Sequence, residues 1–574
     1  MEVRDSRRVP GLSVIWDAPS AVLDVAIEAG LVGPLVQAWE AAARTVLRAL
    51  EWPEDLASRR HLGGVSLALA APLDSLLSAT DVNEWACEQA RASLESVPAR
   101  SLAQALPELR RRIAREKRRH KGLVRVADAA AEHGVSLFTD DDCTSVGMGR
   151  HSLSFATAAL PAVRSIDWPP VRDIPVALVT GTNGKSTSVR MVGAMIAAAG
   201  LTPGMSTTDW VRVGADTLDH GDYAGSSGAR MVLRDQRVDA AVLECARGGI
   251  SRRGLSVRRA RAALITNVAA DHLGEWGVHD LEALTDVKFV VARALVPGGA
   301  LVLNADDAML VKRAASLRPE NLVWFTREAD HPLVREHFAR GGAAAVLDQG
   351  ALWYLASRER RRLASVDELP FLFGGAALHN VSNSLGAIAT GFALGLDEQA
   401  VRRGLGSFSS DTEDNPGRLN EFEFGGVRAL CDFAHNPHGM SALVAMIRAL
   451  EAKRRLVILG QAGDRDDASI RELVRLTLEA RPERIVIKEM PEHLRGRAPG
   501  AVVGVIADEL ERLGYPKSCV EIADNEMDAV RRSLLWARPG DVLLLLLHAQ
   551  RNQVLQWLER VKQAGWKPGL PLPD

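Results

Sequence analysis

The stretch Val176-Ala-Leu-Val-Thr-Gly-Thr-Asn-Gly-Lys-Ser-Thr-Ser188 decides how the middle of this chain folds. Its first five residues form an apolar run that predicts a buried strand. Gly181 and Gly184 permit a tight turn, and the apolar spacing from Val189 onward predicts a helix that ends near Gly200. A strand, a glycine-rich turn and a helix N-terminus together direct several backbone N–H groups to one point, where a polyphosphate binds.

The same stretch carries the side chains that a nucleoside triphosphate needs. Lys185 supplies a compact positive charge for the outer phosphates, and the hydroxyl of Ser186 is a ligand for Mg²⁺. The general phosphate-loop pattern G-x-x-x-x-G-K-[ST] requires glycine where this chain has Val179, so the loop is a shorter variant. A chance glycine–lysine turn is the weaker alternative, because a strand and a helix flank the loop. We expect a nucleotide site formed by Gly181, Thr182, Asn183, Gly184, Lys185, Ser186 and Thr187.

Length and composition narrow the remaining possibilities. At 574 residues the chain is too long for one core, so about three or four domains are expected. A net charge of −2 gives no reason to expect nucleic acid as a partner. The five cysteines lack any C-x-x-C spacing, which argues against a zinc ribbon and favours a cytoplasmic setting. No signal peptide is evident, and the apolar run Val542–Leu547 is too short to cross a bilayer, so no membrane partner is expected. The run instead predicts a buried parallel strand.

The alternation of strands and helices divides the chain into three predicted domains. Residues 1–165 show helical periodicity around 34–50 and 82–120 and predict a mostly helical or mixed α+β domain. Residues 166–415 alternate apolar strands with amphipathic helices, two of them over 281–295 and 378–394, which predicts a central α/β domain of the P-loop type with a parallel sheet. Residues 416–574 repeat this alternation and predict a second, Rossmann-like α/β domain.

Acidic and histidine side chains follow two other predicted strands of the central domain. Glu244 ends the strand 240–244, and Asp271-His272 follow the strand 263–267. Functional groups collect at the carboxyl ends of strands in an open α/β sheet, so Glu244, His272 and Ser186 are predicted to converge on cations beside the phosphates. Mg²⁺ prefers oxygen ligands and keeps waters, so one carboxylate and one hydroxyl are sufficient. Taken singly, Glu244 is better explained as a helix-capping or salt-bridged carboxylate, and His272 as a hydrogen-bonded structural histidine. Their order behind a phosphate loop favours the metal site.

These residues stand in an order that resembles the Mur ligase family, over roughly residues 174–550. Within that family the chain is most similar to the Mur-type half of the cyanophycin synthetases, through Leu243–Ile250, Gly463-Asp-Arg465 and Leu494-Arg-Gly-Arg497. The family motifs present are Gly181–Ser186, Thr207-Thr-Asp209, Glu244, Asn267 with Asp271-His272, Lys288, His379-Asn380 with Asn383, Arg418 and Asp432-Phe-Ala-His-Asn436.

The N-terminal part fits that subfamily more loosely. Ser101–Arg110 and Val124–Phe138 resemble the segment that leads into the ATP-grasp domain of cyanophycin synthetases, and Ser145–Arg150 resembles the start of that domain. The chain then continues almost at once into the Mur-type part. We therefore expect the ATP-grasp domain to be missing, and a separate ATP-grasp enzyme is one partner that this implies.

The resemblance implies an ATP-dependent ligase that activates a carboxylate as an acyl phosphate and joins it to the amine of an amino acid. ATP and Mg²⁺ are the implied cofactors, a small-molecule or peptide carboxylate is the implied acceptor, and a homo-oligomer is compatible with it. Lys185 would neutralise the β- and γ-phosphates, and Ser186, Glu244 and His272 would hold Mg²⁺. Lys288 matches a lysine that is carbamylated in many Mur ligases, with a solvent-facing helical lysine as the alternative. Lys185, His272 and Lys288 are the candidate catalytic residues.

The resemblance also assigns nucleotide contacts in the second half of the chain. Asn380 and Asn383 stand at i and i+3 of a predicted helix, share one face of it, and would contact the nucleotide. Arg418 and Asp432 would approach the nucleotide from the C-terminal domain, so that domain closure completes the site.

Three further residues are expected to contact substrate. The resemblance makes His435 a substrate or nucleotide contact. The loop after the strand 456–459 lies where a Mur-type C-terminal domain receives its amino acid; there Asp464 would pair with a cationic group and Arg465 with a carboxylate. A capped turn followed by a surface arginine explains Asp464 and Arg465 equally well.

A non-catalytic ATP-binding subunit that regulates or scaffolds a separate ligase is the competing hypothesis. A subunit that only binds nucleotide has little need of both metal positions, so the joint presence of Glu244, His272 and Lys288 favours the ligase. A third possibility, an amidotransferase-coupled relative, would carry a zinc-ribbon cysteine cluster, and the sequence has none.

Overall fold

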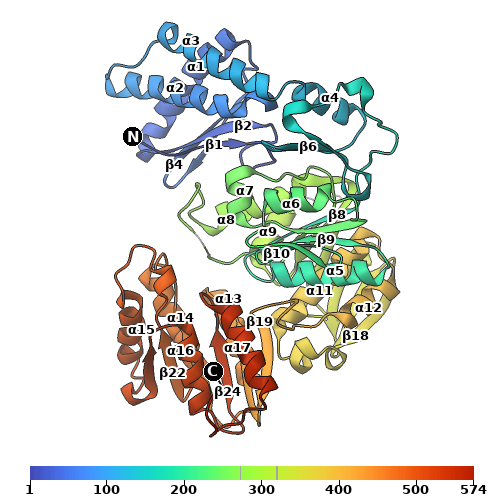
Figure 1. Cartoon of the computed structure of the whole chain (residues 1–574), viewed down its shortest axis with the longest axis vertical. Helices are drawn as coiled ribbons and strands as arrows, with labels where there is room; N and C mark the ends of the chain where they lie inside the picture. Colours follow the sequence, from blue (N-terminus) through green and yellow to red (C-terminus); the bar gives the residue numbers. More distant parts are fainter. Residues whose placement is uncertain (272, 318–320, 574) are drawn as a thin grey trace. The chain divides into compact units, whose positions relative to one another are not determined.

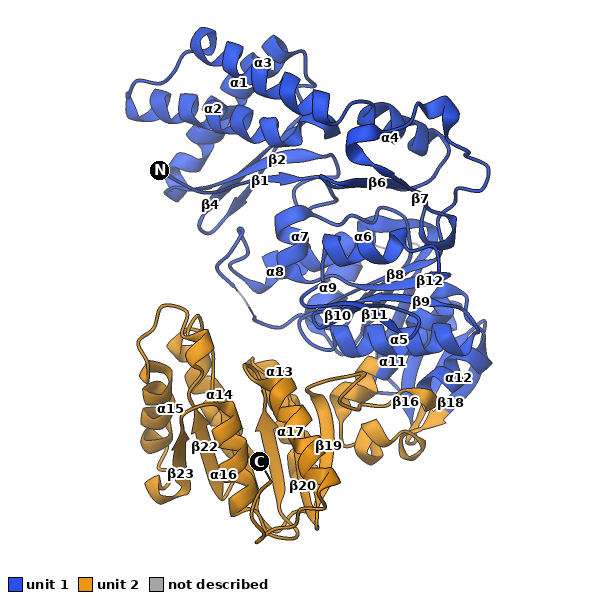
Figure 2. Ribbon diagram, viewed as in Figure 1, with its two compact units in different colours: residues 1–348, 353–363, 384–405 blue, residues 349–352, 364–383, 406–574 orange. Residues whose placement is uncertain are grey.

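The computed structural model describes residues 1–271, 273–317 and 321–573. The chain forms two compact units (Figure 2). Among the described residues, no helix combines the length and the hydropathy of a membrane span. Unit 1 comprises residues 1–348, 353–363 and 384–405, and unit 2 comprises residues 349–352, 364–383 and 406–574.

Unit 1 begins with an antiparallel sheet covered by helices (Figure 1). The strands pair in the order β1-β2-β4-β3, and buried Trp39 packs in the core beneath the helices. The elements are β1 (Glu2–Val9), β2 (Ser20–Ala26), α1 (Val32–Leu50), β3 (Leu56–His61), β4 (Gly64–Ala70), α2 (Leu76–Glu95) and α3 (Leu102–Arg119).

This sheet confirms the mixed α+β alternative for the N-terminal region and corrects one predicted helix. The periodicity over 82–120 belongs to two helices, α2 and α3, rather than to one. Ser96 leaves the helix with a φ of 53°, and the side chain of Gln104 accepts a hydrogen bond of 3.0 Å from the N–H of Ser101 at the start of α3. A second small sheet follows, made of β5 (Leu137–Thr139), β6 (Cys143–Val146) and β7 (Leu153–Ala156) after α4 (Leu123–Glu132).

The central sheet has the order β11-β10-β9-β12-β8-β13-β14-β15-β16-β17-β18. The seven central strands, in the sheet order β9-β12-β8-β13-β14-β15-β16, pair in parallel, as predicted. At one edge, β10 pairs antiparallel with both β9 and β11. The strands are β8 (Val176–Thr180), β9 (Pro203–Ser206), β10 (Trp210–Val213), β11 (Asp216–His220), β12 (Ala240–Glu244), β13 (Ala260–Ile265), β14 (Leu295–Asn304), β15 (Leu322–Thr326), β16 (Ala343–Asp348), β17 (Ala351–Ala356) and β18 (Glu359–Ser365).

Helices connect these strands, which gives the predicted α/β alternation. The helix predicted over 281–295 is shorter, because α8 ends at Lys288 and a 3₁₀ segment covers Phe289–Ala294. The helices are α5 (Lys185–Ala198), α6 (Ser226–Arg234), α7 (Arg247–Arg253), α8 (Leu281–Lys288), α9 (Ala308–Leu317), α10 (Pro332–Ala339), α11 (Leu378–Leu394) and α12 (Glu398–Ser407).

Unit 2 contains a second, mostly parallel sheet with the order β19-β20-β24-β21-β22-β23, in which β19 is the antiparallel strand. The apolar run predicted as a buried parallel strand is β24 at its centre, whose side chains alternate between the cores on the two faces. The elements are β19 (Arg418–Phe424), β20 (Val427–Asp432), α13 (Pro437–Ala449), β21 (Arg455–Leu459), α14 (Asp467–Glu479), β22 (Arg484–Lys488), α15 (Ala501–Arg512), β23 (Val520–Ala523), α16 (Glu526–Trp536), β24 (Val542–Leu546) and α17 (Arg551–Gln563).

Candidate functional site

The glycines of the phosphate loop stand where other residues would not fit. Gly181 has a φ of 150°, and a Cβ at this position would lie 1.8 Å from Oγ1 of Thr266. Gly184 has a φ of 83° and directly precedes the first residue of α5. The turn between β8 and α5 therefore depends on both glycines, and it places the unpaired N–H groups of the first helical turn at the end of the loop.

The two residues that directly follow the neighbouring strand β13 hold the loop in place. The N–H of Asn183 donates to Oδ1 of Asn267 (3.0 Å), and Oγ1 of Thr266 donates to the carbonyl of Asn183 (2.6 Å). The N–H of Thr182 donates to the carbonyl of Asn267 (3.0 Å), and Nζ of Lys185 donates to the carbonyl of Thr182 (2.9 Å). These hydrogen bonds hold the backbone of the loop in one conformation, which lowers the entropic cost of binding a phosphate.

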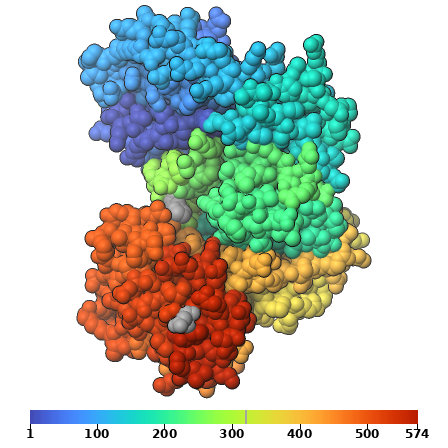
Figure 3. All heavy atoms as spheres, in the orientation of Figure 1, coloured from blue at the N-terminus to red at the C-terminus, as the bar shows by residue number. Residues whose placement is uncertain are grey.

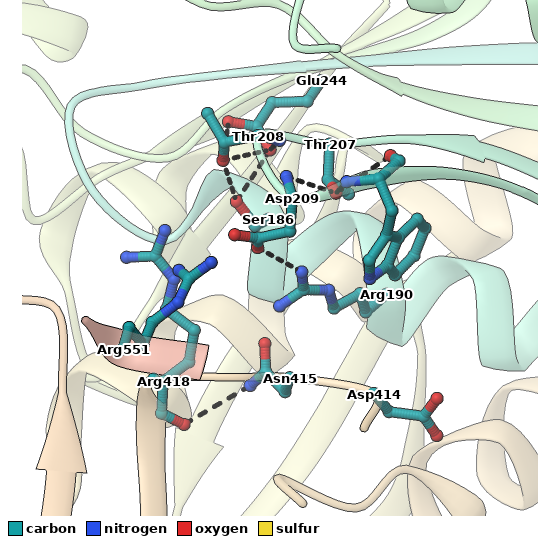
Figure 4. Close-up of polar contacts among 12 residues, drawn as sticks. Ser186, Arg190, Thr207, Thr208, Asp209, Glu244, Asp414, Asn415, Arg418 and Arg551 are labelled. Atoms are coloured by element: carbon teal, nitrogen blue, oxygen red, sulfur yellow. Dashed lines mark hydrogen bonds and ion pairs between the residues drawn. The ribbon is translucent and has the colours of Figure 1, made fainter. Parts of the chain in front are cut away.

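Three oxygen-bearing side chains meet at the start of α5 (Figure 4). Oγ of Ser186 lies 2.7 Å from Oε2 of Glu244 and 3.0 Å from Oγ1 of Thr208. The N–H of Thr208 also donates to Oε2 of Glu244, at 3.3 Å. Glu244 ends β12 and is 1% exposed. Carboxylate and hydroxyl oxygens are the ligands that Mg²⁺ prefers, so this cluster fits the predicted metal.

Two of the three predicted metal ligands lie together in the described part of the chain. The structure brings Ser186 and Glu244 together as the sequence predicts, while His272 lies outside the described residues. Among the residues described, no group of three or more His, Cys, Asp or Glu side chains gathers around one point. Thr208 was not among the predicted site residues; its signal was the Thr207-Thr-Asp209 motif, directly after β9.

A buried ion pair fixes the turn that carries Thr208. Nη2 of Arg190, on α5, lies 2.5 Å from Oδ2 of Asp209, and both side chains are almost fully buried. The guanidinium of Arg190 also lies 5.0 Å from the ring centroid of Trp210. Oγ1 of Thr207 accepts the N–H groups of Asp209 and Trp210 and closes the turn (Figure 4). Helix α5 thereby holds both Ser186 and the turn that places Thr208.

Lys288 is a buried amine at the end of α8. Its residue is 2% exposed, so the solvent-facing alternative is wrong. Burial and, second, the charge of Lys185 lower its pKa well below the usual value of 10.5. A lowered pKa increases the uncharged fraction of the amine, which is the form that reacts with CO₂ to give a carbamate.

In unit 2, the two predicted asparagines lie on α11, as expected. Asn380 donates from Nδ2 to the carbonyl of Phe371 (3.0 Å), and Nδ2 of Asn383 lies 3.4 Å from Oδ1 of Asn380. Both residues are buried, and their contact confirms that they share one face of the helix.

Arg418 and Asp432 occupy paired positions on β19 and β20. The guanidinium of Arg418 lies 4.9 Å from the ring centroid of Phe433. Asp432 accepts hydrogen bonds from the N–H groups of Leu419 (3.0 Å) and Ala434 (2.8 Å). Burial raises the pKa of Asp432 to about 6, against the lowering effect of Arg418 and the two N–H groups.

His435 lies in the loop after β20, at the carboxyl end of the sheet. Its Nδ1 lies 3.1 Å from the carbonyl oxygen of Phe433, and its own carbonyl accepts a hydrogen bond of 3.1 Å from Gln461. Because Gln461 follows β21, this bond joins the loops after β20 and β21, the two strands that flank β24 in the sheet.

The loop 460–467 that carries Asp464 and Arg465 is held by Arg497. Nε of Arg497 donates to the carbonyl of Gly463 (2.8 Å), Nη2 to the carbonyl of Arg465 (2.5 Å), and Nη1 to Asp467 (2.6 Å). A Cβ at Gly463 would lie 1.9 Å from the carbonyl oxygen of Leu494, so only glycine permits this approach. The Leu494-Arg-Gly-Arg497 motif thus positions the loop, a role that the motif alone did not reveal.

A buried ion pair lies beneath this edge of the sheet. Lys488, at the end of β22, pairs with Glu526, at the start of α16, and neither side chain is exposed. Glu526 also accepts the N–H groups of His548 (2.6 Å) and Gln550 (2.9 Å), which fixes the loop after β24. Sequence reasoning missed this pair, because its two members stand far apart in the chain and belong to no motif that we singled out.

Comparison with known proteins agrees with this geometry. The Mur ligase middle domain matches residues 179–391, and the Mur ligase, glutamate ligase domain matches residues 417–546. Together these ranges span more than half of the chain. The chain belongs to the Mur ligase family. The predicted resemblance and α/β fold are thereby confirmed.

Two relatives show where this Mur ligase family member stands. The cyanophycin synthetase of Trichormus variabilis is 34% identical over 386 residues, which cover 67% of this chain and 42% of that protein. The chain therefore spans less than half the length of that relative. The UDP-N-acetylmuramoyl-L-alanyl-D-glutamate–2,6-diaminopimelate ligase of Geobacter metallireducens is 25% identical over 443 residues, covering 73% of this chain and 82% of that protein.

A solved structure shares the fold. E. coli FolC in complex with ADP superposes with a TM-score of 0.50 at 19% identity and covers 68% of this chain and 90% of FolC. At this identity the likeness shows the fold alone.

Proposed function

We propose that this Mur ligase family member is an ATP-dependent ligase that forms an amide bond between a carboxylate acceptor and the amine of an amino acid. The observation that carries the proposal is the cluster of Ser186, Thr208 and Glu244 at the end of a phosphate loop that is already fixed in place. A phosphate loop without this cluster would serve nucleotide binding alone. The absence of a membrane span among the described helices and the free cysteines are compatible with a cytoplasmic setting.

The residues of the central domain supply the electrostatic part of phosphoryl transfer. The N–H groups of the first turn of α5 and the ammonium of Lys185 bind and neutralise the β- and γ-phosphates of ATP. Ser186 and Glu244 would hold Mg²⁺, Thr208 would orient the carboxylate, and His272 would be a further ligand. The metal, when bound, neutralises charge that develops on the phosphate oxygens.

The reaction proceeds in two steps, phosphorylation of the acceptor and attack by the amine. An oxygen of the acceptor carboxylate attacks the γ-phosphorus, and the bond from that phosphorus to the β–γ bridging oxygen breaks to release ADP. The amine nitrogen then attacks the carbonyl carbon of the acyl phosphate, phosphate leaves with the bonding electron pair, and the nitrogen loses a proton. Lys288, carbamylated by CO₂ with loss of a proton, places a carboxylate near the phosphates.

Unit 2 is proposed to bind the amine. The loop 460–467 offers Asp464 for a cationic group and Arg465 for a carboxylate, and Arg497 holds this loop. Asn380, Asn383, Arg418, Asp432 and His435 are proposed to contact nucleotide or substrate. The 34% identity to a cyanophycin synthetase supports acidic peptide-like acceptors, and a separate ATP-grasp enzyme is a proposed partner that makes the acceptor.

The proposal is tested by ADP release across a panel of acidic peptides and amino acids. Wild-type protein should release ADP only when one acceptor and one amine are both present. Lys185→Ala should lower this turnover by about 10²–10³-fold, the scale seen when one electrostatic group is removed from a transition state. Lys517→Ala, which changes an exposed lysine of unit 2, is the matched control. A protein that binds ATP but releases no ADP with any pair would contradict the ligase and favour the scaffold.

A further inference from the structure

The loop 273–280 lies between β13, which ends at Ile265, and α8, which ends at Lys288. The loop folds on itself: the N–H of Gly274 donates to the carbonyl of Val278 (2.7 Å), and the N–H of Val278 donates to the carbonyl of Glu275 (3.0 Å). Val278 is fully buried, and Asp280 caps α8 by accepting the N–H of Ala283 (2.8 Å). The position of this loop therefore sets where α8 begins.

One side of the loop is held by Arg247, the first residue of α7. Its Nη2 lies 2.8 Å from Oε2 of Glu275, and its guanidinium lies 5.0 Å from the ring centroid of Trp276. Arg247 follows Glu244 by three residues, so this contact ties the loop to the metal side of the candidate site.

The other side of the loop is held by the hairpin β3–β4 of the N-terminal sheet. Nη1 of Arg59 donates to the carbonyl of Gly277 at 3.1 Å. The rings of His61 and His279 stack with centroids 5.4 Å apart and an angle of 26° between their planes. Burial lowers the pKa of His61 below 6.5, which favours the uncharged ring in this stack.

Two glycines make the contact between hairpin and loop tight. A Cβ at Gly277, whose φ is 70°, would lie 2.7 Å from the ring of His61. A Cβ at Gly63, in the hairpin turn, would lie 2.8 Å from Nε2 of His279. Larger residues at either position would push the two segments apart.

The base of the N-terminal sheet is fixed to the central domain independently of the hairpin. Leu12 and Leu255 exchange two backbone hydrogen bonds, of 3.0 and 2.7 Å. Arg258 donates to the carbonyl of Asp17 (2.7 Å), and Arg293 donates to the carbonyl of Ser13 (2.6 Å). Figure 3 shows the blue N-terminal residues directly against green central residues. Nε of Arg7, on β1, also donates to the carbonyl of Ser251 (3.1 Å). The hairpin is thus one of several attachments between the N-terminal sheet and the central domain.

We infer that the N-terminal domain positions the active site: Arg59 and His61 hold the loop 273–280, and through it the start of α8 and Lys288. They are positioning residues, because neither belongs to the predicted nucleotide or metal contacts. This inference gives the N-terminal domain a role inside the ligase and rests on the proposed function only for its catalytic consequence.

Hydrogen exchange of the peptide that spans 273–280 tests whether Arg59 and His61 hold this loop. Arg59→Ala and His61→Ala, made separately, should each raise exchange in this peptide by about tenfold, as expected when a loop loses an anchor of roughly 1.4 kcal/mol. Arg60→Ala is the matched control, because Arg60 is exposed on the same strand. Exchange in β1 and β2 should stay unchanged in all three variants. Equal exchange at 273–280 in Arg59→Ala, His61→Ala and Arg60→Ala would overturn the inference.

The turnover rate of the full chain tests whether the position of the loop matters for catalysis. Arg59→Ala should lower kcat by about 10- to 100-fold, the scale of a misplacement near the reacting groups, while the Kd for MgATP changes less than about threefold. An unchanged kcat beside raised loop exchange would overturn the positioning role and leave the contact merely structural. If the wild type shows no turnover, the proposed function fails, and the exchange result still decides whether the hairpin holds the loop.

Discussion

The two units place their candidate sites at the same kind of position, the carboxyl ends of parallel strands, but build them differently. In unit 1 a contiguous loop, Gly181–Thr187, supplies the phosphate-binding backbone, and the two nearby strand ends add single residues. In unit 2 the candidate site depends on residues from several separate segments of the chain. Hydrogen bonds from Arg497 hold the loop 460–467. The buried pair of Lys488 and Glu526 lies beneath this edge of the sheet.

The difference follows from what each site is proposed to recognise. Phosphates are bound by backbone N–H groups, which every residue carries, so the sequence needs only glycines for the turn and one lysine. An amino-acid substrate is bound by side chains, and those side chains must be held by others that are distant in sequence. Unit 2 should therefore be sensitive to changes at residues that touch no substrate.

The largest loss of stability in unit 2 is expected from a change at Lys488. Lys488→Met leaves the carboxylate of Glu526 buried and without its cation, which should lower the free energy of unfolding by about 3–5 kcal/mol. Scanning calorimetry should show a shift of roughly 6–20 °C in the transition of unit 2. Lys517→Met breaks an exposed pair with Glu511 and should cost less than about 1 kcal/mol. Equal shifts in the two variants would mean that the buried pair does not support the site.

The next effect is expected at Gly463. Gly463→Ala places a Cβ against the carbonyl oxygen of Leu494 and should destabilise unit 2 by about 1–3 kcal/mol and raise the KM for the amine. Gly504→Ala lies inside α15 with open space around its Cβ, so it should stabilise unit 2 by about 0.5–1 kcal/mol. Urea unfolding of both variants measures the contrast. A neutral Gly463→Ala would show that loop 460–467 is not held against Leu494.

Asp432 should make the stability of unit 2 depend on pH. Its folded pKa of about 6 lies above the usual 3.8, so between about pH 4 and pH 6 the folded state binds more protons than the unfolded state. The free energy of unfolding should therefore fall as the pH rises through this window, by up to about 3 kcal/mol. Asp432→Asn should remove this slope, whereas Asp464→Asn, at an exposed position, should retain it. The two variants are compared by urea unfolding at pH 4 and pH 7.

The smallest effect is expected in unit 1, at Thr208. Thr208→Val removes the hydroxyl beside Ser186 and Glu244 but keeps the side-chain shape. The Mg²⁺ concentration needed for half-maximal nucleotide binding should rise about tenfold, as for other groups that orient a metal ligand. Thr217→Val on the edge strand β11 should leave it unchanged. A Thr208→Val protein with wild-type metal dependence would mean that Glu244 needs no orientation.

The same contrast explains what the sequence could predict. The loop from β8 to α5, the buried strand β24 and the convergence of Ser186 with Glu244 were predictable, because each rests on local periodicity or on the strand-end rule. The N-terminal sheet, the pair of Lys488 and Glu526, and the hold of Arg59 on Gly277 were not. The two contacts join segments that are far apart in the chain, and a single sequence carries no signal for such pairings. The strands of the N-terminal sheet lie close together in the chain, but the helical periodicity around 34–50 and 82–120 dominated the prediction for this region.

The central claim is that the carboxylate of the acceptor attacks the γ-phosphate of ATP, and isotope transfer tests it most directly. An acceptor that supports ADP release is labelled with ¹⁸O in its carboxylates and turned over with ATP and the amine. The account predicts that one ¹⁸O atom appears in each phosphate released, seen as an isotope shift in the ³¹P spectrum, and that Lys185→Ala abolishes the labelled signal. Phosphate that carries no ¹⁸O, at wild-type rates of ADP release, would contradict the account.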